Sequence, residues 1–291
     1  MVVQVKALAC EIPARLGIPL SRFSTSELAR EAVARGITAS ISGATVWRWL
    51  SADALKPWQH RSWIFPRDPQ FEAKAGPALD LYQRLWEGRS LRPDEYVVSA
   101  DEKTSLQARI RLHPTQPPAP GQAMRTEHEY QRGGALAYLA AWDVHRAKVF
   151  GRCEQTTGKQ PFGRLVEQVM TQEPYASAHR VFWILDNGSS HRGKAAVERL
   201  QTAWPTLTVV HLPVHASWLN QIEIYFSIIQ RKVLTPPDFD SLAAIEQRLL
   251  AFETRFGEVA RPFEWKFTRA NLAALMAKLT NDPPEPLALC A

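Results

Sequence analysis

Hydrophobic residues give way abruptly to polar ones at the end of one short segment, residues 181–185. Five consecutive β-branched, aromatic or aliphatic side chains fill it, a pattern typical of a strand that is buried on both faces. The strand is predicted to end at Asp186, because turn-forming residues follow. A second strand is predicted to end at Asp101. A carboxylate at the end of a buried strand is poorly solvated unless it binds a partner, so both aspartates are candidate site residues.

The order of strands and helices predicted over residues 94–282 indicates a mixed sheet. The strand before Asp101 is followed by a proline-rich loop and then by two predicted strands, 134–143 and 148–153, that form a hairpin. Helices then alternate with strands, and the last helix of the series is predicted over 218–233. The order β-β-β-α-β-α-β-α favours an α/β architecture of the ribonuclease-H-like kind, with helices on both faces of the sheet.

The first 65 residues predict a small all-helical domain. Ser24 and Glu27 fit a capping box that begins one helix, and Ser42 is placed to cap a second. Two short helices with a tight linker form a helix-turn-helix pattern, with a basic β-wing predicted over 60–65. The alternative is a plain helical hairpin whose tryptophans form its core. The predicted DNA-facing residues of this domain are Thr45, Arg48 and Arg61.

Two further segments complete the predicted organisation. Residues 66–93 are expected to be a linker that carries one helix, over 71–87, and residues 283–291 a frayed tail. Residues 66–93 are also the segment where we would expect a contact between two copies of the chain.

Composition changes this picture only slightly. A net charge of +6 and a pI near 9.3 favour a polyanionic partner, although many soluble proteins are equally basic. No apolar run approaches the roughly 20 residues of a membrane span, and the N-terminus lacks the pattern of a signal peptide. Cys10, Cys153 and Cys290 are far apart and lack metal-type spacing, which indicates reduced thiols in a cytoplasmic protein.

Three acids are predicted to form one catalytic and metal-binding site: Asp101, Asp186 and Glu223. In a ribonuclease-H-like sheet the first and fourth strands are parallel neighbours, so both aspartates emerge at one edge, beside the helix that carries Glu223. Carboxylates so close together repel one another unless cations neutralise them. Two Mg²⁺ or Mn²⁺ ions about 4 Å apart would suit phosphodiester displacement. Taken singly, each acid is explained as well by a turn or a solvated helix position; jointly, they favour the metal site.

Other polar residues near these acids are accessory candidates. Asn187 and His191 follow the second aspartate, where they would contact the scissile phosphate or orient a metal-bound water, or else form the turn and cap the next helix. Asn220 is expected to support the start of the Glu223 helix in the manner of an N-cap. Arg231 and Lys232, late on that helix, are candidates for phosphate contacts, although a solvated helix end explains them equally well.

The chain resembles bacterial transposases of insertion-sequence family 630, within the Tc/mariner-like superfamily that has a DDE catalytic domain. The resemblance rests on VSADEKT at 98–104, WILDNGSSH at 183–191 and LPVHASWLNQIE at 212–223, supported by 133–149 and 261–269. It implies Mg²⁺-dependent cut-and-paste transposition, binding to terminal inverted repeats as a homodimer, and insertion at TA dinucleotides. Relatives carry two helical DNA-binding modules, and the first is expected to be absent here.

Two other functions remain open at this point. A truncated DNA-binding regulator would occupy transposon ends with little cleavage, which the missing first module favours and the intact acid triad opposes. A ribonuclease-H-like nuclease acting on RNA–DNA hybrids would share the fold and the metal ions. That reading leaves the helix-turn-helix pattern without a role.

Overall fold

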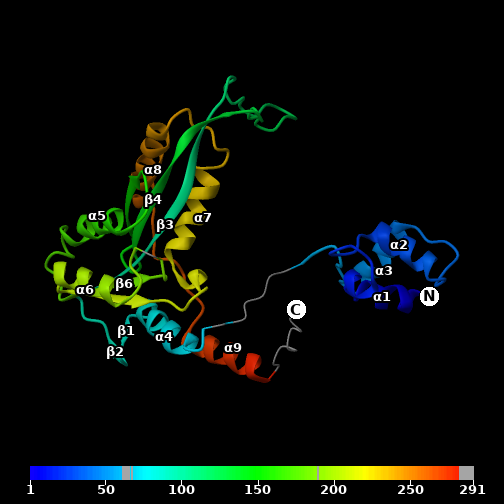
Figure 1. Ribbon diagram of the computed structural model, residues 1–291, viewed down its shortest axis with the longest axis horizontal. Coiled ribbons are helices and arrows are strands. Elements are labelled where there is room, and N and C mark those ends of the chain that lie inside the picture. Colours follow the sequence, from blue (N-terminus) through cyan, green and yellow to red (C-terminus); the bar gives the residue numbers. More distant parts are fainter. Residues whose placement is uncertain (61–65, 67, 189, 282–291) are drawn as a thin grey trace. The chain divides into compact units, whose positions relative to one another are not determined.

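The structure is a computed structural model that describes residues 1–60, 66, 68–188 and 190–281 (Figure 1). The chain divides into two compact units, Met1–Ile64 and Phe65–Ala291. Within the described ranges, no helix is long and apolar enough to cross a membrane.

The small unit is a cluster of short helices. Its elements are α1 (Val2–Ala9), a 3₁₀ turn η1 (Pro13–Leu16), α2 (Thr25–Ala34) and α3 (Gly43–Ala52). The predicted capping box is confirmed, because the Ser24 side chain accepts from the Glu27 backbone and the Glu27 side chain accepts from that of Ser24. Ser42 caps α3 as predicted. The sequence did not predict α1, which has no side-chain cap and is held by packing against α2 and α3.

The tryptophans of α3 do not all belong to the core. Val46 and Leu50 are fully buried, and Trp49 packs beside them. Trp47 is 53% exposed, so the interpretation of these tryptophans as core residues is wrong for Trp47. Arg61 and the predicted wing lie outside the described residues.

The large unit is built on a mixed five-stranded sheet in the order β5-β4-β3-β6-β7. β3, β6 and β7 are parallel neighbours, whereas β4 runs antiparallel to β3 and β5 runs antiparallel to β4. This ribonuclease-H-like sheet confirms the predicted fold class, including the parallel pairing of its first and fourth strands. The strands are β3 (Glu95–Ile110), β4 (Gln131–Asp143), β5 (Lys148–Glu154), β6 (Arg180–Leu185) and β7 (Leu207–His211).

Helices cover both faces of the sheet, and β6 shows why. Val181 and Trp183 face a core shared with α5 (Lys159–Met170) and α6 (Lys194–Ala203). Phe182 and Ile184 face a second core. That second core is shared with α4 (Phe71–Tyr82), α7 (Ile222–Lys232), α8 (Leu242–Gly257) and α9 (Arg269–Asn281). The uninterrupted apolar run is therefore explained by two buried faces, as predicted.

The predicted linker differs from what the structure contains. α4 ends at Tyr82 instead of 87, and Leu85–Trp86 (β1) pairs with Arg89–Ser90 (β2) in a small hairpin. Arg84 and Glu87 adopt positive φ angles of 59° and 49°, which a continuing helix does not allow. Residues of α4 are buried in the second core, so this segment is part of the large unit.

β3 does not end at Asp101, as the sequence predicted, but continues to Ile110 beside β4. The proline-rich region that follows is irregular, as predicted, apart from isolated bridges such as Gln116↔Arg125. Together β3, β4 and this region form an arm at the top of Figure 1.

Candidate active site

Asp101 and Asp186 stand at the same level of the sheet. The parallel ladder between β3 and β6 ends with the pair Ser99↔Ile184. Continuing that register by two residues places Asp101 opposite Asp186. Asp101 remains within β3, paired with Ala140 of β4. The pairing with β6 thus ends at Ser99, two residues before Asp101, and both aspartates lie just beyond the end of this ladder.

Glu223 is brought beside them because the start of α7 is fastened to β3. The Asn220 amide donates to the Ala100 carbonyl at 3.0 Å and to Asp101 Oδ2 at 3.4 Å. The Ser99 hydroxyl donates to Asn220 Oδ1 and accepts from the backbone N–H of Ile222. These bonds hold the first turn of α7, which contains Glu223, against the strand that carries Asp101.

The predicted N-cap-like role of Asn220 is therefore wrong in its detail. A 3₁₀ turn, η2 (Ser217–Leu219), precedes α7, and the N-cap residue Gln221 makes no side-chain cap bond. Asn220 is fully buried and bonds to β3 instead. Its partners lie more than a hundred residues away in the sequence, so local spacing could not reveal them.

Sequence reasoning missed two residues that support this junction. Ser99 is the one polar residue between Val97 and Ala100, and that isolated position was a usable signal. Tyr82, at the end of α4, donates its hydroxyl to the Leu219 carbonyl at 2.7 Å and accepts from the Gln221 N–H at 3.4 Å. Nothing in the local pattern distinguishes Tyr82 from an ordinary core residue.

Asp186 is held by a different set of donors. Its Oδ1 accepts from the Gly188 backbone N–H at 2.7 Å and lies 2.8 Å from His191 Nε2. The fully buried His191 also contacts Ser190, whose hydroxyl donates to Glu102 at 2.7 Å. The bond from His191, followed by that from Gly188, lowers the pKa of Asp186 despite its burial.

Asn187 fastens the next loop. Its side-chain amide donates to the Leu212 carbonyl at 2.7 Å, which ties the end of β7 to the turn after β6. The geometry agrees with a turn-forming role for Asn187, whereas His191 bonds Asp186, a contact that the sequence did not predict.

The three acids interact electrostatically. Burial, followed by the charges of Asp186 and Glu223, raises the pKa of Asp101 to about 7. Burial also raises the pKa of Glu223, with Lys103 opposing the rise and Asp186 adding to it. Mutual repulsion of this kind is what a bound cation relieves.

The three carboxylates have the right chemistry for a divalent metal ion, but they do not form a complete binding site by themselves. Hard carboxylate oxygens are the ligands of Mg²⁺ and Mn²⁺. Among the residues that the structure describes, no group of three or more His, Cys, Asp and Glu side chains lies close enough to hold an ion by itself. Mg²⁺ is usually bound by one or two carboxylates together with substrate phosphates and water, so pairs from these acids suffice.

The predicted DNA-facing residues belong to different units. Arg231 and Lys232 are exposed at the end of α7. In the small unit, Arg48 is exposed and donates to Thr45 Oγ1 at 3.1 Å.

A family model described as DDE superfamily endonuclease matches residues 96–246, more than half of the 291 residues. The chain belongs to the DDE superfamily of endonucleases. All three acids of this DDE protein, as well as Asn220 and His191, lie within the matched range.

Solved structures support the fold of this DDE domain. The Mos1 mariner paired end complex with Mn has a TM-score of 0.56 at 17% identity, with 88% of this chain and 71% of that chain covered. A pre-cleavage Mos1 transpososome has a TM-score of 0.53 at 14% identity, with coverages of 96% and 78%. At such identities the likeness concerns the fold. No curated protein matches the chain.

Proposed function

We propose that this DDE endonuclease is a transposase of the type found in insertion-sequence family 630. It would cut DNA at terminal inverted repeats, join the freed ends to target DNA and favour TA dinucleotides. The observation that carries the proposal is the level placement of Asp101 and Asp186 on neighbouring parallel strands, with Glu223 fastened beside them.

The same three acids would hold Mg²⁺ or Mn²⁺. When two such ions are bound, they supply an activated water or 3′-hydroxyl and stabilise the leaving oxygen of an in-line displacement. The chain's own part is to position the ligands. His191 and Gly188 orient the Asp186 carboxylate, and Asn220 fixes both Asp101 and the first turn of α7. Pre-positioned ligands avoid reorganisation when substrate arrives.

DNA recognition is proposed for the small unit and the end of α7. On α3, Arg48 and Trp47 are exposed together, and an arginine beside an aromatic side chain suits contacts with base edges and phosphates. Arg231 and Lys232 would contact backbone phosphates near the acids. The solved Mos1 structure with Mn is a paired end complex, which supports the proposal of a homodimer that holds two ends together.

A cleavage assay tests the proposal. Duplex DNA that carries the terminal repeats flanking the gene is incubated with the protein and Mg²⁺, with EDTA as the metal-free control. An RNA–DNA hybrid of the same sequence distinguishes a ribonuclease. We expect strand cleavage at the repeat ends only with the metal. Cutting of the hybrid alone, or binding of the repeats without cleavage in Mg²⁺ or Mn²⁺, would contradict the proposal.

A further inference from the structure

Lys103 lies on the same side of β3 as Asp101. No register shift occurs between these two residues, so their side chains point to one face. Directly opposite Lys103 on β4 is Tyr138, whose hydroxyl lies 3.4 Å from that of Tyr225 on α7. Cross-strand partners share a face, so Lys103 points toward α7, the helix that carries Glu223.

This lysine has no fixed partner. Its positive charge reaches Glu223, where it opposes the rise of that residue's pKa. In the part of the chain that the structure describes, Lys103 nevertheless makes no hydrogen bond and no ion pair, and its side chain is half-buried. A half-buried ammonium with three unused donors is suited to an anionic ligand.

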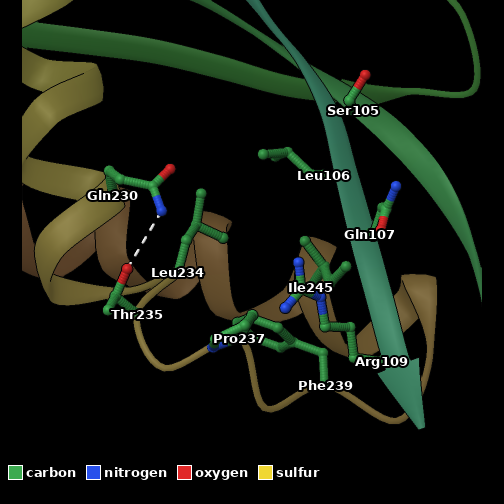
Figure 2. Close-up of a pocket in the computed structure, with 10 residues that line it drawn as sticks. All are labelled: Ser105, Leu106, Gln107, Arg109, Gln230, Leu234, Thr235, Pro237, Phe239 and Ile245. Atoms are coloured by element: carbon green, nitrogen blue, oxygen red, sulfur yellow. Dashed lines mark hydrogen bonds between the residues drawn. The ribbon is translucent and has the colours of Figure 1, made fainter. Parts of the chain in front are cut away.

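A bulge in β3 follows Lys103 immediately. The register with β4 shifts between Lys103 and Leu106, and Ser105 adopts a φ angle of 60°. Such a bulge gives the strand one extra residue and reverses which side chains face α7. Leu106 consequently packs into the same core that Val97 enters before the bulge. Figure 2 shows Leu106 extending from β3 toward Gln230 and Leu234.

The bulge therefore separates a polar stretch from an apolar one on a single face. Asp101 and Lys103 form the polar stretch next to Glu223, and the apolar packing begins at Leu106. On this face of β3, Lys103 is the residue that precedes the bulge. Bulges beside active sites commonly re-aim a side chain in this way.

We propose that Lys103 binds a phosphate of the DNA strand that lies over the three acids. The inference rests on the proposed function and adds a contact residue to that site. Three carboxylates repel the phosphate backbone, and a lysine at their border offsets part of that repulsion while its ammonium donates to phosphate oxygens. A lysine that only neutralised Glu223 would not need to touch DNA at all, and experiment separates these two roles.

Salt dependence of DNA binding is the direct test. Binding is measured in Mg²⁺ in an Asp186→Asn background, in which cleavage is expected to be blocked, with a 30-base-pair duplex as the probe. Lys103→Ala should make the plot of log affinity against log salt shallower by about 0.9, the value for one lost phosphate contact. Lys103→Arg should restore most of the slope. Lys278→Ala, an exposed lysine of α9 without a partner among the described residues, is the matched control and should change nothing.

Cleavage kinetics in the otherwise unchanged protein complete the test. We expect Lys103→Ala to lower kcat/KM by about tenfold to a hundredfold, the usual size for a charged hydrogen bond, and to raise KM. An unchanged salt slope with a lower kcat would overturn the inference, because Lys103 would then act through Glu223. Thermal unfolding shows whether each variant is folded; if Lys103→Ala is not, Lys103→Gln is measured in its place. Absence of cleavage by the wild-type protein counts against the proposed function, whereas the salt slope alone decides the contact.

Discussion

Asp101 and Asp186 occupy equivalent levels of two neighbouring strands, yet their surroundings differ. Asp186 accepts from the Gly188 backbone and from His191, and its pKa lies below the ordinary value. Asp101 accepts a bond from its neighbour Glu102 and a longer one from Asn220, and burial raises its pKa to about 7. The surroundings of Asp186 favour its ionised form, whereas those of Asp101 disfavour it.

The two aspartates therefore represent two different environments for a carboxylate that binds a cation. Two donors from its own loop stabilise Oδ1 of Asp186 without any ligand. The ionised form of Asp101 is unfavourable in its buried surroundings, and a bound cation would stabilise it. The asymmetry predicts that substitutions of equal chemistry will have unequal effects on the two aspartates.

The largest expected effect is on catalysis, and here the two aspartates should behave alike. Asp101→Asn and Asp186→Asn each remove one anionic oxygen ligand, so strand cleavage should fall by about a thousandfold or more. DNA affinity should stay within about tenfold, because recognition is proposed to lie elsewhere. Cleavage assays and binding measurements on the same DNA check this. If either variant still cleaved, that residue would be removed from the site.

Stability without metal should then separate them. In the folded protein Asp101 keeps a proton up to about pH 7, whereas in the unfolded chain its pKa is near 3.8. Its contribution to stability is therefore present below about pH 4 and is lost as the pH rises toward 7. Asp101→Asn should raise the free energy of unfolding by on the order of 2–4 kcal/mol at pH 8 in EDTA, and by almost nothing at pH 4.

Asp186→Asn is the matched comparison and should have the opposite sign. A lowered pKa stabilises the folded protein above the ordinary value of 3.8, and this stability disappears when the pH falls through the folded pKa. We expect a loss of about 1 kcal/mol at pH 8. Thermal unfolding of both variants across this pH range measures the two effects. Shifts of the same sign would refute the proposed asymmetry.

A smaller effect is expected when the support of Asp186 is removed. His191→Ala deletes the ring that bonds Asp186, so cleavage should fall by about tenfold to a hundredfold, and a higher Mg²⁺ concentration should be needed for the half-maximal rate. His145→Ala is a suitable control, because His145 is half-buried and bonds the Leu81 carbonyl, away from Asp186. Equal losses in the two variants would mean that general destabilisation is the cause.

The smallest expected effect comes from Gly188→Ala. A Cβ at this position would lie 2.9 Å from His191 Cε1 and 3.0 Å from Asp186 Oδ1, so the imidazole must move. Displacing a positioning group slightly should slow cleavage by about threefold to tenfold. Gly163→Ala serves as the control, since a Cβ there meets nothing within 4 Å. An unchanged rate would show that the contact between His191 and Asp186 is not needed in this geometry.

The sequence predicted the elements whose evidence is local. Residues 181–185 alternate between two cores, and the predicted capping residues Ser24 and Ser42 both cap their helices. The order of these elements was sufficient to place two aspartates at one edge of the sheet. The same reasoning extended one helix to residue 87, because Leu85 and Trp86 continue its periodicity and the turn depends on backbone angles.

What the sequence could not predict depends on distant partners. β3 continues beyond Asp101 because β4 pairs with it, although the polar residues after Asp101 resemble the start of a loop. Asn220 looks like a capping residue, but its partners are on β3. The support of the site by Tyr82 likewise follows from tertiary packing alone.

The bulge at Ser105 has a counterpart in β4, where the register shifts back between Gln107 and Arg109 of β3, opposite Gly134 with its φ of 96°. β3 has one extra residue at the first shift and β4 has one at the second, so the two strands return to their original register. Insertions or deletions in the region beyond Ile110 would thus leave the alignment of the acids untouched, and natural variation can accumulate there. A single-residue insertion between Asp101 and Leu106 would instead change the register of β3 against β4 directly beside the acids.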